Sequence, residues 1–175
     1  MSGYYIYFIC SLPMLHFGAK PSMGVERFIQ LASELLSQED VRILKACTQK
    51  NIYEHKMEQP TLNKWLTFDT ALRNELVKVR SSRKKTDPAK YLRQDGYTEP
   101  AISHLALNAY RSPSILEGER MLDMERWRFL EGLSLGHYFD LDFLIVYTLK
   151  LLMLERWEKI RTADKEQLLE EAIKT

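Results

Sequence analysis

The side chains best suited to bind metals or to act as nucleophiles are four histidines and two cysteines, which are scattered along the chain. The histidines are His16, His55, His104 and His137. None of them belongs to a metal-ligand motif such as HExxH or CxxC. Cys10 and Cys47 lie in apolar sequence, which favours small buried side chains in a reducing compartment. The sequence therefore predicts no metal site, no cofactor and no catalytic residue.

Acidic residues and phosphate-binding loops give no stronger indication of catalysis. The chain has neither GxGxxG nor GxxxxGK[ST], so no loop that cradles a nucleotide is predicted. Carboxylates are numerous in its second half: Glu117, Glu119, Asp123, Glu125, Glu131, Asp140 and Asp142. Solvated helix faces account for so many acids. We therefore expect a protein that is not an enzyme; a small enzyme would need His104 or His137 to meet two acids in the fold.

The densest basic segment is 78–90, KVRSSRKKTDPAK, which holds six Lys and Arg residues. Such residues can contact phosphates, but no aromatic residues alternate with them to stack on bases. The formal net charge of the whole chain is only +1. A basic helix end, which complements the negative end of the helix dipole, explains the segment without a ligand. Nucleic-acid binding through 78–90 remains the alternative function.

The composition fits one helical domain spanning residues 1–175. The hydrophobic share is 45% and the mean hydropathy is −0.33, both typical of a soluble globular chain. Residues 1–24 are expected to form an aromatic segment followed by a loop, and 163–175 a short helix that frays. No Lys or Arg precedes the apolar start and no small-residue cleavage site follows it. We therefore expect a cytoplasmic protein rather than a secreted one.

The most apolar segment, Asp140 to Arg161, predicts a central helix. Its apolar residues go all the way round a helical wheel, which favours burial on most sides. Asp140 is expected to cap its N-terminus. The uninterrupted part, Phe143 to Leu154, contains Lys150 and is shorter than the roughly 20 residues that a membrane span needs. The segment is thus predicted to be a core helix.

The remaining apolar periodicity predicts a mainly α fold, a bundle of about six to eight helices. Further helices are expected at 25–36, from Ser37 past Cys47, and at 61–83, 87–93, 100–110 and 112–136, the last with Ser112 as its N-cap and Pro113 at its first position. Tyr4 to Cys10 is rich in aromatic and β-branched residues, which favours a short strand. A buried helix start is the other interpretation of this segment, because periodicity does not distinguish the two in short apolar runs.

A four-residue pattern occurs twice, as Met124–Trp127 (MERW) and Leu154–Trp157 (LERW). Neighbouring antiparallel helices would have reason to place these side chains alike. We expect each tryptophan to lie in the core and each Glu–Arg pair to stay in water.

Several segments of the chain form a recognisable set. They are the opening YYIYFICSLPML with Phe17-Gly18, the helix around Phe28, the Ser37–Asp40 turn, Ala71–Leu76, Leu122-Asp123, Trp127, and Tyr147-x-x-Lys150-Leu151. Together these segments resemble a family of uncharacterised bacterial proteins encoded within V-type ATP synthase gene clusters. A weaker similarity connects Leu122-Asp123, Trp127 and Asp140-Leu141-Asp142 with the C/d-type central-stalk component of V/A-type ATPases. This chain is distinctly shorter than that component.

The resemblance implies a non-catalytic subunit or accessory protein that binds V-type ATP synthase subunits. Such a protein would be cytoplasmic and peripheral to the inner membrane, with no small-molecule substrate. The aromatic N-terminus and the charged face of 61–83, with Lys84 directly after it, are its candidate interfaces: Tyr4, Tyr5, Tyr7, Phe8, Arg73, Glu75, Arg80, Arg83 and Lys84. The alternative for the N-terminus is that it completes the core.

Overall fold

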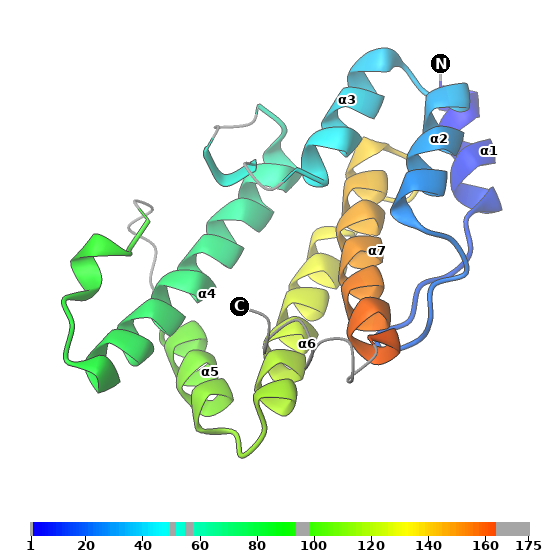
Figure 1. Ribbon diagram of the computed structural model, residues 1–175. Coiled ribbons are helices and arrows are strands. Elements are labelled where there is room, and N and C mark those ends of the chain that lie inside the picture. The colour runs from blue at the N-terminus through cyan, green and yellow to red at the C-terminus, as the bar shows by residue number, and fades with distance from the viewer. Residues whose placement is uncertain (1, 50–51, 55–57, 94–98, 164–175) are drawn as a thin grey trace, which may run out of the picture. The chain divides into compact units, whose positions relative to one another are not determined.

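The computed structural model describes residues 2–49, 52–54, 58–93 and 99–163 (Figure 1). Their elements are α1 (Ser2–Ser11), α2 (Val25–Leu35), α3 (Gln38–Cys47), the 3-10 helix η1 (Ile52–Glu54), α4 (Pro60–Lys84), the 3-10 helix η2 (Pro88–Lys90), α5 (Pro100–Arg111), α6 (Ile115–Leu133) and α7 (Leu141–Thr162). These residues include seven α-helices and no strand. The prediction of a mainly α fold is confirmed.

The chain divides into two compact units. Unit 1 consists of Met1–Thr48 and Phe139–Thr175, so it combines α1, α2 and α3 with the distant α7. Unit 2 is the continuous segment Gln49–Tyr138, which holds α4, α5, α6 and both 3-10 helices.

An aromatic stack forms the core of unit 1. Phe28 of α2 lies between Phe8 of α1 and Tyr147 of α7, with ring centroids 5.6 and 5.2 Å away. The hydroxyl of Tyr147 donates a hydrogen bond to the carbonyl of Pro13 at 3.0 Å. The stack therefore joins the consecutive helices α1 and α2 to the distant α7.

Helix α7 is the predicted central helix, and it begins directly after Asp140. The Asp140 carboxylate accepts a hydrogen bond from the Phe143 backbone N–H at 3.0 Å. Every residue from Leu144 to Leu149 is buried, as expected of a helix that is apolar all round. Within unit 1 it packs against α2 and α3, and Glu155 accepts a 2.7 Å hydrogen bond from Val25 N–H at the start of α2. No helix of the described residues is long and apolar enough to cross a membrane.

The N-terminal segment is a helix, so the strand predicted for Tyr4 to Cys10 is wrong and the helical alternative holds. Phe8 and Ile9 are buried, and Tyr5 donates a 2.6 Å hydrogen bond to Asp40 of α3. Positions 5, 8 and 9 share a face only in a helix, so these contacts outweigh the strand propensity of the individual residues.

The start of α6 also differs from the prediction. The N-cap is Ser114, not Ser112, and the Ser114 hydroxyl accepts a 3.5 Å bond from the Glu117 N–H. Ser114 to Glu117 has the S-x-x-E pattern of a capping box, a better start signal than Ser112-Pro113. The helix ends at Leu133, before Gly136 with its positive φ of 84°. The helix predicted for 163–175 lies, apart from Ala163, outside the described residues.

In unit 2, α5 runs parallel to the second half of α4, whereas α6 runs antiparallel to it. Ser103 donates a hydrogen bond to Glu75 at 2.9 Å, and Arg83 donates one to Tyr110 at 2.7 Å. Residue numbers therefore increase in the same direction along α4 and α5. The chain comes back to the middle of α4 before α5 begins. There the Asn74 amide exchanges two 2.9 Å hydrogen bonds with the backbone of Arg93. In the antiparallel pair of α4 and α6, the ring of Phe68 stacks on the ring of Phe129, with 3.9 Å between the ring centroids.

Candidate functional site

A buried polar cluster joins α4, α6 and η1 at the centre of unit 2. Asp69 is only 1% exposed and accepts three hydrogen bonds of 2.6 Å each. Its Oδ1 accepts from Arg126 Nε, and its Oδ2 accepts from Arg73 Nε and the Tyr53 hydroxyl. Arg126 also donates to Asp123 at 2.9 Å. Two carboxylates and two guanidiniums thus balance each other inside unit 2.

The charge state of this polar cluster follows from its contacts. Burial alone would raise the pKa of Asp69, but the Arg126 and Arg73 guanidiniums, with the Tyr53 hydrogen bond, outweigh it and hold the pKa below its usual range. Burial by itself lowers the pKa of Arg126, but Asp69 and Asp123 outweigh it and raise that pKa. Burial, and then Asp69, raise the pKa of Tyr53. Asp69 is therefore ionised at neutral pH, and the cluster acts as an internal clamp between helices.

We expect the free energy of unfolding to fall as the pH drops below about 4, the usual pKa of an unfolded aspartate. The folded pKa of Asp69 is lower, so its stabilisation is complete above the unfolded pKa and disappears as the pH falls through the folded one. Urea midpoints between pH 7 and pH 3 would measure this decline. The Asp69→Asn variant should show a shallower decline, whereas parallel profiles for the two proteins would contradict the assignment to Asp69.

A pocket of about 370 Å³ lies where α4, α5 and α6 meet within unit 2. It is lined by Leu76, Arg80, Arg83, Ala109, Tyr110, Ser112, Ile115, Gly118, Glu119 and Leu122. Arg83 lies over the Tyr110 ring, 5.8 Å from its centroid, and donates to its hydroxyl. The pocket therefore has two arginines and polar groups around an apolar floor.

The charged residues predicted for docking on 61–83 fall into two groups. Arg73 belongs to the buried polar cluster, and buried Glu75 accepts bonds from Lys78 and Ser103. Both side chains thus serve contacts within unit 2. Arg80, Arg83 and Lys84 are exposed, and the two arginines line the pocket while Lys84 does not. The structure brings Arg80 and Arg83 together with residues of α5 and α6 that the sequence did not single out.

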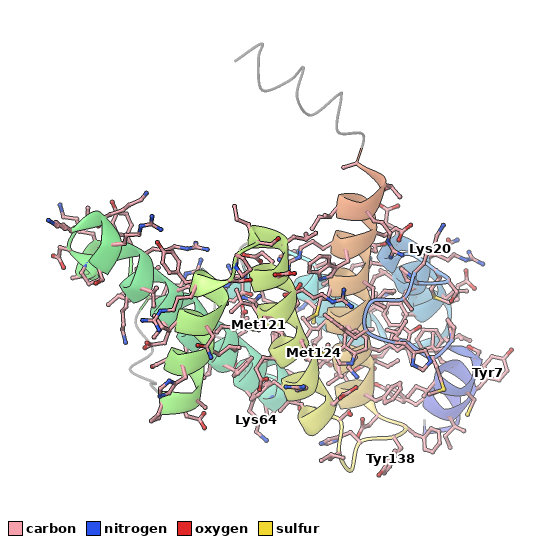
Figure 2. All side chains as sticks on the ribbon, turned by 90° about the horizontal axis from the view of Figure 1, so that it is seen from below. Tyr7, Lys20, Lys64, Met121, Met124 and Tyr138 are labelled. Atoms are coloured by element: carbon pink, nitrogen blue, oxygen red, sulfur yellow. The ribbon has the colours of Figure 1, made fainter. Side chains whose placement is uncertain are left out.

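The aromatic residues predicted as an interface lie on α1, and the helix buries some of them and exposes others. Phe8 is in the core, and Tyr5 is half-buried against Asp40. Tyr7 is 68% exposed and projects away from α1 in Figure 2. Ile6 is 46% exposed, and Met14, just beyond the helix, is 82% exposed. We call Ile6, Tyr7 and Met14 the α1 face; the side chain of Tyr4 lies outside the described residues.

Among the described residues, the histidines and cysteines singled out in the sequence differ in exposure, and His137 is half-buried. His16 and His104 are exposed, and His55 lies outside the described residues. Cys47 is buried as predicted, and burial raises its pKa to about 12. Cys10 was also expected to be buried, but it lies on the outward side of α1 and is exposed.

Residues Gly132–Gly136, GLSLG, match the GxSxG pattern of a nucleophile elbow. That motif needs a serine on a sharp turn between a strand and a helix. Ser134 is instead the C-cap of α6, and its hydroxyl donates to the Glu131 carbonyl at 2.8 Å. Ser134 therefore lies in a different structural context from the serine of that motif.

Residues 103–175 match a protein family described as "Protein of unknown function (DUF2764)". The matched part includes most of α5 and all of α6 and α7. No curated protein and no solved structure was found to match the chain. The predicted likeness to an uncharacterised family is thus confirmed in this general form, and the match carries no information about an ATP synthase.

Proposed function

We propose that this protein is a non-catalytic accessory or stalk-like subunit of a V-type ATP synthase, which works by binding other subunits. The assignment to this complex is supported by the sequence resemblance, including the opening aromatic segment and Leu122-Asp123. The observation that carries the binding role is the exposure of Ile6, Tyr7 and Met14, the three large apolar side chains of the α1 face.

The α1 face has the composition and support of a protein interface. Tyrosine and methionine are enriched at such surfaces, since both supply apolar area and tolerate water. The helix that carries the face is fixed from behind by the Phe8–Phe28 stack and by the Tyr5–Asp40 hydrogen bond. A partner would therefore meet a surface that needs little ordering, which lowers the entropic cost of association.

Native mass spectrometry of the tagged chain, purified gently from its own cells, tests the assignment. V-type ATP synthase subunits in fixed stoichiometry are expected to accompany the chain. If the chain is recovered alone or only with unrelated proteins, the proposal is wrong.

Replacing Tyr7 with aspartate should reduce partner recovery about tenfold or more, because a charge would enter an apolar contact. The thermal midpoint should stay near that of the wild type, since Tyr7 is 68% exposed. Tyr91→Asp is the matched control, because Tyr91 is a similarly exposed tyrosine (64%) in unit 2. Equal recovery with both variants would show that the α1 face is not the binding surface.

Nucleic-acid binding is the second candidate, favoured by the exposure of Arg80, Arg83, Lys84, Lys85 and Lys90 in the basic segment. RNA or DNA would then accompany the purified chain, and its affinity would fall steeply with salt. Charge reversal at Arg83, Lys84 and Lys85 would abolish that affinity, whereas Tyr7→Asp would not change it.

A further inference from the structure

We propose that the pocket of unit 2 binds a small organic anion, namely a carboxylate or phosphate attached to a short apolar group. The pocket combines a basic side, Arg80 and Arg83, with an apolar floor formed by Leu76, Ala109 and Leu122. Its volume of about 370 Å³ is near the lower end of the range for small-molecule sites. The basic side and the floor together define an amphiphilic ligand.

The two arginines present their guanidiniums from the same face of α4, because residues three apart on a helix are neighbours. Arg83 is held in place by its 2.7 Å hydrogen bond to the Tyr110 hydroxyl. That oxygen accepts from Arg83, so the Tyr110 proton remains available to a ligand. Arg80 is exposed and makes no hydrogen bond or ion pair among the residues described. A planar guanidinium matches both carboxylate and phosphate geometry.

The apolar floor belongs to the packed core of unit 2. Leu76 and Leu122 are 8% and 3% exposed, and both line the pocket. Ile115 stands at the rim and is 91% exposed. A ligand with an apolar group would cover these side chains and remove their surface from water. An inorganic anion would leave that surface wet.

The wall between α5 and α6 is fixed by a close backbone approach at Gly118. A methyl group added there would lie 2.5 Å from the Ala109 carbonyl oxygen, so only glycine permits this approach. The close packing of α5 and α6 therefore fixes one wall of the pocket.

Glu119 also lines the pocket and opposes an anion. The three charged lining residues still sum to +1, so the pocket attracts an anion. Removing this negative charge with Glu119→Gln should therefore tighten anion binding, the opposite of the effect of removing Arg80.

Titration of the whole 175-residue chain with octanoate and octyl phosphate, monitored by calorimetry and NMR, tests this site. Binding of both probes should reach saturation. Arg80→Gln should reduce the affinity for each probe about tenfold or more, the usual effect of losing a charge-assisted hydrogen bond. Lys64→Gln is the matched control: Lys64 is on the same helix (Figure 2) and does not line the pocket. Neither side chain is part of the core, so thermal midpoints should be unchanged.

Two further probes test the basic side and the apolar floor of the pocket separately. Octanol, which has no charge, and inorganic phosphate, which has no apolar group, should each bind about tenfold more weakly than octyl phosphate or not at all. Tyr7→Asp should leave all titrations unchanged, because Tyr7 belongs to unit 1. The inference is overturned if neither amphiphile saturates, if Arg80→Gln binds as well as Lys64→Gln, or if phosphate alone matches octyl phosphate.

Discussion

Replacing Asp69 with asparagine is expected to lower the free energy of unfolding of unit 2 by about 3–5 kcal/mol, the usual result of breaking a buried ion pair. The side chain keeps its size, so no cavity forms and the loss comes from charge and hydrogen bonding. The variant amide offers one oxygen where the carboxylate accepts from Arg126, Arg73 and Tyr53. Arg126, itself 9% exposed, would be left with Asp123 as its remaining carboxylate partner in the polar cluster.

Glu125→Gln is the matched control for this prediction. Glu125 is also a carboxylate paired with an arginine, Arg128, but the side chains of that pair are 39% and 66% exposed. Exposed pairs contribute little, so the control should change stability by less than about 1 kcal/mol. Urea unfolding measures both variants, and hydrogen exchange in peptides of α4 and α6 assigns the change to unit 2. A loss below about 1 kcal/mol for Asp69→Asn would mean that the polar cluster does not clamp the helices.

A double-mutant cycle with Arg126→Met separates the pair from its surroundings. If Asp69 and Arg126 stabilise one another, the double variant should be less destabilised than the sum of the two single variants. Strict additivity would indicate that Arg73 and Tyr53, rather than Arg126, account for the contribution of Asp69.

The helices could be predicted because their signals are local. Asp140 caps α7 and Ser37 caps α3 through contacts within a few residues, and both starts were predicted. The boundary of α6 was missed because two serines, Ser112 and Ser114, compete as caps. The helical state of 4–10 depends on Phe28 and Asp40, which are distant in sequence, so local propensity favoured the wrong structure.

The polar cluster could not be predicted because its partners meet only in the fold. The repeated pattern that ends at Trp127 indicated a core tryptophan with a solvated Glu–Arg pair. Trp127 is indeed buried, but so is Arg126, whose partner Asp69 lies 57 residues away. In the second copy, Trp157 is only half-buried. Spacing on α4 does place Asp69 and Arg73 at i and i+4, a local signal that could have identified one half of the cluster.

The fold gives Arg80 and Arg83 different surroundings from Arg73 and Glu75, the charged residues that were also predicted for docking. All of them lie on one helix, and sequence alone ranks them equally. Glu75 is buried by α5 because Ser103 approaches it, whereas Arg80 and Arg83 lie beside the pocket at the far end of the same helix pair. The direction of α5, set by the return of the chain at Asn74 and Arg93, therefore decides which charges remain available.

Replacing Phe28 with alanine is expected to destabilise unit 1 by about 3–5 kcal/mol, the range found for emptying a buried phenylalanine site. Phe28 is fully buried and lies between the rings of Phe8 and Tyr147. Its removal takes away both stacking contacts and leaves a cavity at the point where α1, α2 and α7 meet. Phe28→Leu, which refills most of the volume, should cost clearly less. Similar losses for the two variants would show that the cavity is not the main cause.

The same variant also tests how α1 is held for binding. Phe8 is the core anchor of α1, so losing its stacking partner should increase hydrogen exchange in α1 before it does so in α4 to α6. Recovery of partner subunits should then fall even under conditions where the variant is folded, because the α1 face is no longer fixed. Octanoate binding to unit 2 should stay at the wild-type level, since neither Phe8 nor Phe28 belongs to that unit. Equal loss of both activities would instead mean that the two units depend on each other for folding.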